Sequence, residues 1–244
     1  MAPKPSALVS AESVSQLEVL LLSGLLCDES AWDDVQAALG ATAVVRAIAF
    51  PDFDSIETMA QAVLAAAPER FALAGHSMGG RVALAIVAQA PHRVERLALL
   101  NTGVHPRRPG EAEKRQELVD LAYSAGMAVV AERWLPPMLA PSRVDDAALM
   151  ERLTAMICRQ TPDSFAGQTR ALLGRPEAEQ GLSAITCPTL LLSGRQDGWS
   201  PLAQHESMAA QISRSRVVAI DESGHMSIAE QPVAVAAALR EWLA

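Results

Sequence analysis

The sequence has few cysteines, fewer basic than acidic residues and no long apolar run, and each of these shortages excludes a class of protein. The three cysteines, Cys27, Cys158 and Cys187, lie far apart and form no Cys-x-x-Cys pair. Neither a disulfide framework nor a structural zinc site is therefore supported. The 20 lysines and arginines stand against 28 acidic residues, for a net charge of −8. A surface that binds phosphates needs the opposite sign, so we expect no nucleic-acid partner.

No segment reaches the roughly 18 uninterrupted apolar residues that a membrane span needs. Residues 1–16 contain one lysine, two prolines and several serines. They lack the apolar block of a secretory signal, so we expect a loosely ordered lead-in. Together with the unpaired cysteines, this predicts a cytoplasmic protein that binds no membrane. The sequence does not predict an oligomeric state.

The residues that are abundant predict a folded core. Half of the 244 residues are hydrophobic and 20% are charged, with a mean hydropathy of +0.16. This is the composition of one large domain, or of one domain with an insertion. Short apolar runs alternate with longer amphipathic stretches, a pattern typical of parallel strands joined by helices. The expected strands are residues 17–23, 43–50, 71–74, 94–100, 189–193 and 217–220. We therefore predict an α/β fold, a mostly parallel sheet with helices on both faces.

Between the fourth and fifth expected strands this alternation stops. Residues 102–185 show helical patterns at 118–125, 128–135, 147–159 and 162–173, but no strand-like run. About 80 residues is too long for a simple crossover. We interpret residues 102–185 as a helical cap inserted into a core made of residues 17–101 and 186–244. Ligands of such sheets bind outside the carboxyl ends of the strands, so a cap there would roof the binding site.

A candidate nucleophile lies where the third expected strand meets the next helix. Gly75-His76-Ser77-Met78-Gly79 contains a Gly-x-Ser-x-Gly pattern, in which a tight bend makes the serine hydroxyl project from the sheet edge. Glycine-rich turns also serve packing or phosphate binding. Phosphate loops, however, favour a lysine or a Gly-x-Gly-x-x-Gly spacing, and neither occurs here. The context favours a catalytic serine at Ser77.

A serine hydroxyl needs a base to remove its proton. His76 lies inside the turn itself, while His92 and His205 are expected at a helix end and on a surface helix. His105 lies in the loop that leaves the fourth strand and is a candidate to line a pocket. His225 follows the last strand, on the same sheet edge as Ser77, and is our candidate base. The alternative for His225 is a solvated loop histidine.

The base needs an acid to orient it. Asp197 directly follows the fifth strand and reaches the same sheet edge, although a turn aspartate can also simply cap its own loop. Asp221 and Glu222 are rivals, but they belong to the histidine's own loop. The residues after the fourth strand, Asn101-Thr102, offer no carboxylate. These positions favour Asp197.

The chain order Ser77, Asp197, His225 resembles that of the α/β-hydrolases, which place nucleophile, acid and histidine in this order at these strand ends. The resemblance extends from Leu17 to Ala244 and is closer in the core than in the cap. Within this superfamily the sequence is most similar to small capped bacterial carboxylesterases and to meta-cleavage hydrolases. These motifs are specific for fold and triad, and not for the substrate.

The resemblance implies an oxyanion hole made of two backbone N–H groups. One belongs to Met78, the residue after the nucleophile. The other comes from the loop after the first strand, where the family commonly has His-Gly and this chain has Ser23-Gly24. Leu25 is the expected donor, with Leu26 as the alternative. Leu26 and Trp199 are also expected to line an apolar substrate pocket.

The resemblance implies a serine hydrolase that cleaves a small to medium carboxylic ester, with no metal ion and no organic cofactor. The alternatives are C–C bond hydrolysis or a lyase reaction by the same triad, or a ligand-binding protein without activity. The cap region also contains six arginines. One of them is a candidate to bind a substrate carboxylate, since arginine binds that group bidentately, and we expect most of them to be solvated. The six are Arg107, Arg108, Arg143, Arg159, Arg170 and Arg175.

Overall fold

The structure, a computed structural model, describes residues 17–244; the expected lead-in, residues 1–16, lies outside the described residues. The six expected apolar runs form one sheet, in the order β2-β1-β3-β4-β5-β6. All five neighbouring pairs are parallel. The strands are β1 (Glu18–Leu22), β2 (Val44–Ile48), β3 (Phe71–His76), β4 (Val94–Leu100), β5 (Thr189–Gly194) and β6 (Ser215–Ile220). The predicted parallel sheet is confirmed.

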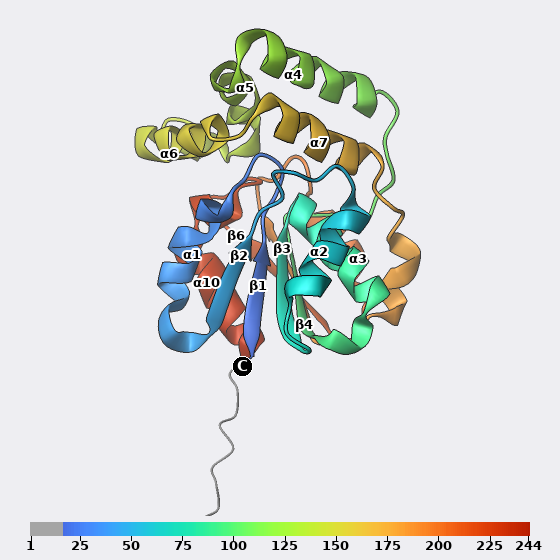
Figure 1. Ribbon diagram of the computed structural model, residues 1–244. Helices are drawn as coiled ribbons and strands as arrows, with labels where there is room; N and C mark the ends of the chain where they lie inside the picture. Colours follow the sequence, from blue (N-terminus) through green and yellow to red (C-terminus); the bar gives the residue numbers. More distant parts are fainter. Residues whose placement is uncertain (1–16) are drawn as a thin grey trace, which may run out of the picture.

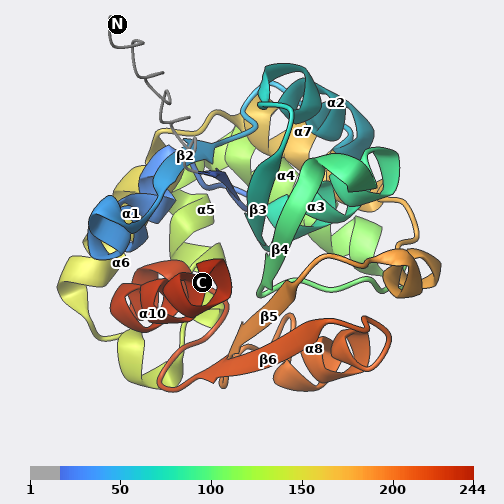
Figure 2. The ribbon, with the colours of Figure 1, turned by 90° about the horizontal axis from the view of Figure 1, so that it is seen from below.

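Helices cover both faces of this sheet, as predicted. In Figure 2, α1 and α10 lie on one side of the strands, and α2, α3 and α8 lie on the other. The bounds are α1 (Asp33–Leu39), α2 (Ile56–Ala66), α3 (Met78–Gln89), α8 (Leu202–Ala209), α9 (Ser227–Glu230) and α10 (Pro232–Leu243). Both faces of the inner strands are therefore buried, which explains their continuous apolar runs. Leu20, Leu21 and Leu22 of β1, for example, have no exposed surface.

Four further helices lie between β4 and β5 in the sequence and stack above one end of the sheet (Figure 1). They are α4 (Glu111–Ala125), α5 (Met127–Trp134), α6 (Ala147–Cys158) and α7 (Pro162–Leu173). We call these four helices the cap. Many of their apolar residues are buried, among them Val130, Leu153 and Phe165. The cap is therefore packed as part of the molecule's hydrophobic core.

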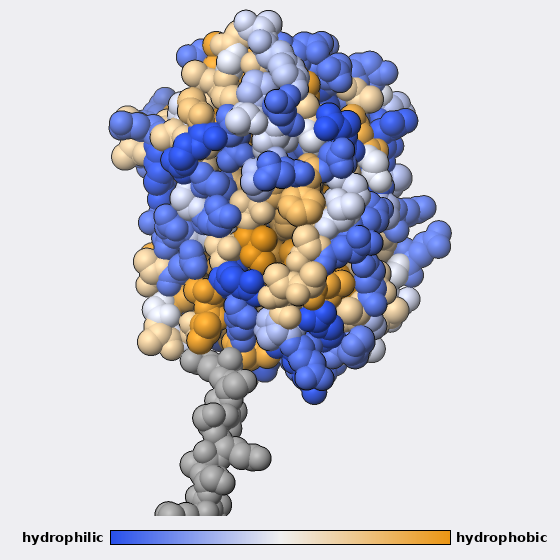
Figure 3. Space-filling view, viewed as in Figure 1, coloured by the Kyte–Doolittle hydropathy of each residue, from blue (hydrophilic) through white to orange (hydrophobic). Residues whose placement is uncertain are grey.

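The outer surface separates polar flanks from an apolar strip. On the face shown in Figure 3, hydrophilic residues cover much of the cap and both sides, and apolar residues gather toward the middle. The edge strand β2 is only partly buried, and its Val44 is 52% exposed. Within residues 17–244, no helix combines the length and the apolar character that crossing a bilayer requires.

Candidate active site

Ser77 occupies a strained backbone position between β3 and α3. Its φ of 53° and ψ of −113° lie in a region that residues with a side chain rarely adopt. The bend is possible because its two neighbouring glycines carry no Cβ. A Cβ on Gly75 would overlap the backbone of Gly79, and one on Gly79 would overlap the Leu22 carbonyl. The Ser77 N–H donates to the Leu100 carbonyl at 2.9 Å, which fixes the turn against β4.

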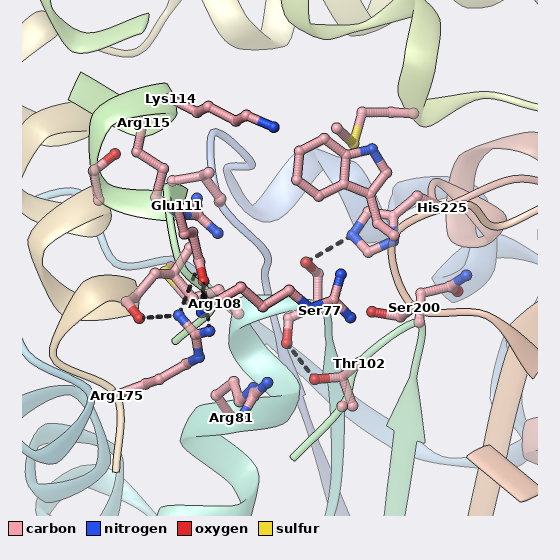
Figure 4. A pocket seen from close by; sticks show the side chains of 18 of the residues that line it. Ser77, Arg81, Thr102, Arg108, Glu111, Lys114, Arg115, Arg175, Ser200 and His225 are labelled. Atoms are coloured by element: carbon pink, nitrogen blue, oxygen red, sulfur yellow. Dashed lines mark hydrogen bonds and ion pairs between the residues drawn. The ribbon is translucent and has the colours of Figure 1, made fainter. Parts of the chain in front are cut away.

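His225 faces the serine from the loop after β6. Its Nε2 lies 2.8 Å from the Ser77 Oγ, as Figure 4 shows. The imidazole is 7% exposed, and its own backbone N–H donates to the Met138 carbonyl at 2.7 Å. The structure thus brings together two side chains that are 148 residues apart in the sequence.

Asp197 holds the far side of this imidazole. The His225 Nδ1 donates to the Asp197 Oδ2 at 2.9 Å, so that Nε2 is free to accept the serine proton. The other carboxylate oxygen, Oδ1, accepts the backbone N–H groups of Trp199 and Ser200 at 2.8 and 2.9 Å. Burial would raise the pKa of Asp197, but the charge of His225 and these hydrogen bonds hold that pKa well below its usual range. The carboxylate is therefore ionised at neutral pH.

Asn101 completes this network, although the sequence indicates only that its position carries no carboxylate. Its Nδ2 donates to the Asp197 Oδ2 at 2.9 Å and to the Gly224 carbonyl at 3.1 Å. Its Oδ1 accepts a short hydrogen bond from the Ser227 hydroxyl. A buried polar residue at the carboxyl end of the strand beside β5 was the available signal. Asn101 positions the acid without being one.

Glu230 fastens the histidine loop to the segment between α5 and α6. Its carboxylate, 3% exposed, accepts the backbone N–H groups of Ala140, Gly224 and Met226 at 2.7 to 3.1 Å. Burial raises the pKa of Glu230, although these donors oppose the rise. No local sequence pattern marked this residue, because its partners come from two separate loops.

Two other histidines support the site from behind. The His76 Nε2 donates to the His225 carbonyl at 2.8 Å, and burial lowers the pKa of His76 to about 3. His205 was expected on a surface helix, but it is fully buried because α8 packs against β5 and β6. Its Nε2 accepts the Thr102 N–H at 3.2 Å, and burial lowers the pKa of His205 to about 4. Both imidazoles are therefore neutral at pH 7.

The two backbone donors expected for an oxyanion lie beside Ser77. Leu25 and Met78 both line the pocket that contains the serine. Among the described residues, none accepts a hydrogen bond from the N–H of Leu25 or of Met78. Both groups are therefore available to a ligand oxygen.

Leu26 was expected as an alternative oxyanion donor and as a lining residue of the pocket, and the structure places it in neither role. Its N–H donates to the Oε1 of Gln168, a cap residue on α7, at 2.9 Å. Its side chain is fully buried and is not among those that line the pocket. The expectation that Leu26 lines the pocket is thus wrong, because the backbone turns at this residue with a φ of 61° and the side chain enters the core. Gln168, which also donates to the Phe50 carbonyl at 3.1 Å, was not singled out in the sequence.

The pocket has a volume of about 330 Å³ and lies between the sheet edge and the cap. Around Ser77 it is lined by Leu25, Trp134, Met138, Phe165, Leu172 and Trp199. Trp199, expected there, is 45% exposed and stands next to the loop of Asp197. His105, the other expected lining residue, also borders the pocket. Among residues 17–244, no three His, Cys, Asp or Glu side chains converge to hold a metal ion.

Comparison with known proteins agrees with this geometry. The chain matches the sequence profile of the alpha/beta hydrolase family over residues 19–238. It is 26% identical to the pimeloyl-[acyl-carrier protein] methyl ester esterase of Nitrosomonas europaea, over 85% of this chain and 88% of that one. It is 28% identical to the 2-hydroxymuconate semialdehyde hydrolase of Pseudomonas sp. CF600, over 72% of this chain and 62% of that one.

A solved structure is similar as well. A thermophilic esterase from Thermogutta terrifontis, studied with malate bound, superimposes with a TM-score of 0.84 and 30% sequence identity. The match covers 93% of this chain and 89% of that chain. The similarity therefore includes the cap as well as the sheet.

Proposed function

Because the chain belongs to the alpha/beta hydrolase family, we propose that it is a serine hydrolase that cleaves a small to medium carboxylic ester. The observation that carries this proposal is the continuous pair of hydrogen bonds from Ser77 through His225 to Asp197. The serine of this chain opens into a pocket of ligand size. The esterases among the relatives, from Nitrosomonas europaea and Thermogutta terrifontis, support the choice of an ester.

The first half of the reaction forms an acyl-enzyme. The Ser77 Oγ attacks the ester carbonyl carbon while its proton moves to the His225 Nε2. The carbonyl oxygen becomes an oxyanion, and the N–H groups of Leu25 and Met78 donate to it. Such donors typically contribute about 10²- to 10³-fold each to turnover. When the intermediate collapses, the C–O bond to the alcohol breaks and the alcohol takes the proton from Nε2.

The second half repeats these steps with water. His225 takes a proton from the water, whose oxygen attacks the acyl carbon, and the bond to the Ser77 Oγ breaks as that oxygen regains its proton. Asp197 remains ionised throughout and stabilises the imidazolium that forms in each half. Its low pKa, maintained by the hydrogen bonds from His225, Asn101 and Ser200, suits this role. The products are one carboxylic acid and one alcohol.

We further propose that residues 102–185 act as a cap that selects the substrate. The cap contributes Trp134, Phe165 and Leu172 to the pocket wall. The side chain of Gln168, on α7, accepts a hydrogen bond from the N–H of Leu26. This bond holds the loop that contains the Leu25 donor. The same segment thus shapes the pocket and braces the oxyanion loop.

Replacing the nucleophile tests the proposal. Ser77→Ala should lower turnover of a p-nitrophenyl ester by about 10⁴-fold or more and should abolish labelling by a fluorophosphonate probe. Ser207→Ala is the matched control, because Ser207 is exposed on α8 and its hydroxyl only donates to the Ala203 carbonyl. A Ser77→Ala protein that keeps its turnover would contradict the proposal. A folded wild-type protein that neither turns over esters nor takes the label would indicate a ligand-binding member without activity.

C–C bond hydrolysis is the second candidate. The similarity to a 2-hydroxymuconate semialdehyde hydrolase favours it, and the triad geometry suits both reactions. A substrate panel separates the two: esters of increasing acyl length, a vinylogous diketone and a cyanohydrin. Faster turnover of the diketone than of every ester would replace the ester proposal with C–C hydrolysis, and preferred cleavage of the cyanohydrin would replace it with a lyase reaction.

A further inference from the structure

The pocket has a second end that the proposed mechanism does not use. In Figure 4 this end lies across the pocket from His225, beneath α4, with Ser77 between the two. Five cationic side chains line it, and Glu111 is the one carboxylate among the lining residues. The cations are Arg81, Arg108, Lys114, Arg115 and Arg175. We call this group the cationic end. It places an excess of positive charge in a pocket of a protein whose net charge is −8.

Glu111 is already fully engaged by two of these cations. Arg175 donates to both of its carboxylate oxygens, at 2.9 and 2.8 Å, and the Arg115 Nε donates to one of them at 2.9 Å. Burial would raise the pKa of Glu111, but the hydrogen bond from Arg175 and those of its other donors lower it to about 2. The remaining donors of Arg175 bind the carbonyls of Leu172, Pro106 and His105. Arg175 is therefore satisfied within the protein.

Arg81 is not satisfied. It lies on α3 and is only 7% exposed. Its Nη2 donates to the His105 carbonyl at 3.0 Å, but its buried Nη1 has no hydrogen-bond partner among the described residues. Within residues 17–244, no carboxylate forms an ion pair with Arg81, Arg108 or Lys114. Arg115 and Arg175 both pair with Glu111. Burying a charged group without a partner is unfavourable by several kcal/mol.

The cations also repel one another. Burial and the charge of Arg175 lower the pKa of Arg81 to about 9, and Arg115 and Arg108 contribute in the same direction. Arg81 nevertheless stays protonated at neutral pH. The charge of Glu111 opposes this lowering of the pKa, but Glu111 forms its ion pairs with Arg115 and Arg175. The buried Nη1 of Arg81 is therefore a donor that remains available to an anion.

From these observations we propose that the cationic end binds a free carboxylate of the substrate, so that the enzyme's substrates are half-esters of small dicarboxylic acids. This inference rests on the proposed function, in which Ser77 attacks the ester group. A planar carboxylate suits the fork of an arginine, which offers two parallel N–H donors. Arg81 is the central residue, and the exposed Arg108 and Lys114 attract the anion at the pocket mouth.

The placement of Arg81 on α3 keeps it close to the nucleophile. Arg81 follows Ser77 by four residues, about one helical turn, or a rise of roughly 6 Å. The Arg81 N–H donates to the Ser77 carbonyl at 3.4 Å, so the nucleophile and the guanidinium belong to one rigid unit. The ester and the carboxylate of a substrate are therefore joined by a short chain, for which succinate, glutarate and adipate half-esters are suitable probes.

The wild-type protein provides the first test. We expect kcat/KM for at least one monomethyl half-ester to exceed that for the dimethyl ester of the same acid by about tenfold or more, the scale of one charge-assisted contact. The preference should shrink as salt is raised, because the exposed cations are screened. Equal or faster hydrolysis of the dimethyl ester across the whole series would overturn the carboxylate site and leave the esterase proposal intact.

Ligand binding to the Ser77→Ala protein provides the second test, which does not depend on turnover. Titration with glutarate, followed by calorimetry, should show saturable binding. Adding Arg81→Gln should weaken that binding about tenfold or more, and adding the exposed Lys114→Gln, which leaves the buried packing untouched, should weaken it several-fold.

Arg133→Gln is the matched control in the cap. Arg133 is exposed, pairs with Glu117 at 3.4 Å and does not line the pocket, so its loss should leave glutarate binding unchanged. Glutarate binding that is absent, or equal in all these variants, would overturn the inference. Tighter binding of inorganic phosphate than of glutarate would also overturn it, since the site would then not be built for a carboxylate.

Discussion

The two ends of the pocket differ in how far their polar groups are satisfied. At the end with His225, Asp197 accepts hydrogen bonds from an imidazole, an amide and two backbone N–H groups. At the cationic end, Arg81 is buried with one nitrogen unpartnered. The first arrangement holds a geometry with the protein's own groups alone. The second leaves a buried N–H donor without a partner, and a binding site for an anion needs such a donor. The pocket keeps these two arrangements on opposite sides of Ser77.

The largest effect is expected from a substitution at the end of the pocket that contains Asp197 and His225. Asp197→Asn should lower kcat for a p-nitrophenyl ester by about 10⁴-fold, because an amide no longer selects the imidazole tautomer that leaves Nε2 free. The fold should survive, since the side chain keeps its size, and a thermal melt checks this. A loss of less than about tenfold would mean that Asp197 does not orient the base.

Low pH should destabilise the folded protein through His76 and His205, the two buried histidines behind the triad. The folded protein holds the pKa of His76 at about 3 and that of His205 at about 4, below the ordinary value near 6.5. Between pH 6.5 and 4 the unfolded chain therefore binds protons that the folded chain does not. The free energy of unfolding should fall as the pH falls, by up to about 1.4 kcal/mol per pH unit for each histidine.

Denaturant titrations from pH 7 to pH 4 measure this slope. His205→Gln should make it shallower, while His92→Gln, at an exposed position in a short turn before β4, should leave it unchanged. Glu111 and Asp197 contribute separately and at lower pH. Their pKa values are depressed in the folded state, so their stabilisation is lost only as the pH falls below about 4. Glu230, whose pKa burial raises, acts on this slope with the opposite sign, so the decisive comparison is between variants. A slope that His205→Gln leaves unchanged would show that His205 is not buried in its neutral form.

The sequence predicts most of the fold because the buried strands have no polar face. The strand Val94–Leu100 and the helix Pro162–Leu173 have the predicted bounds, and the other strands differ by one or two residues at their ends. The largest difference is α4, predicted from residue 118 and found from Glu111. Its first two turns are almost entirely polar, so they show no apolar periodicity. They nevertheless form helix, and Glu111 is held there by Arg175.

Some residues of the site can be predicted from local sequence patterns, and others cannot. Ser77, Asp197 and His225 each follow a strand, so their positions could be read from the sequence. Asn101 also follows a strand, but it carries no carboxylate, and its role depends on a partner 96 residues away. Gln168 acts through Leu26, 142 residues away, and no local pattern encodes such a pair. The arginines that the sequence offers as partners of a substrate carboxylate all lie in the cap region. Arg81 belongs to the regular helix after Ser77, and the missing partner of its Nη1 is evident only in the folded structure.

The smallest expected effect on the free energy of unfolding comes from replacing Arg81 at the cationic end. Arg81→Met removes a buried charge that has no ion-pair partner, but it keeps a long side chain at a second cavity, whose other lining residues include Leu84 and Ile185. The His105 carbonyl still accepts a hydrogen bond from Arg175 at 3.3 Å, so little is left unsatisfied. Replacing such a charge by an apolar group is often neutral or stabilising, and we expect the free energy of unfolding at pH 7 to rise by about 1 kcal/mol or less.

Asn101→Leu is the opposite replacement at the satisfied end. It leaves the Ser227 hydroxyl without a partner and the Gly224 carbonyl with only the Ser223 hydroxyl as donor, at 3.4 Å. It should lower the free energy of unfolding by about 1–3 kcal/mol. Glutarate should stabilise the wild-type protein in the same denaturant titration and should not stabilise Arg81→Met, since a ligand raises stability only where the folded state binds it. If Arg81→Met instead loses about 2 kcal/mol or more, Arg81 is a structural residue and the two ends of the pocket do not differ. If it is as stable as the wild-type protein but no longer responds to glutarate, the unpartnered guanidinium is retained for the ligand and not for the fold.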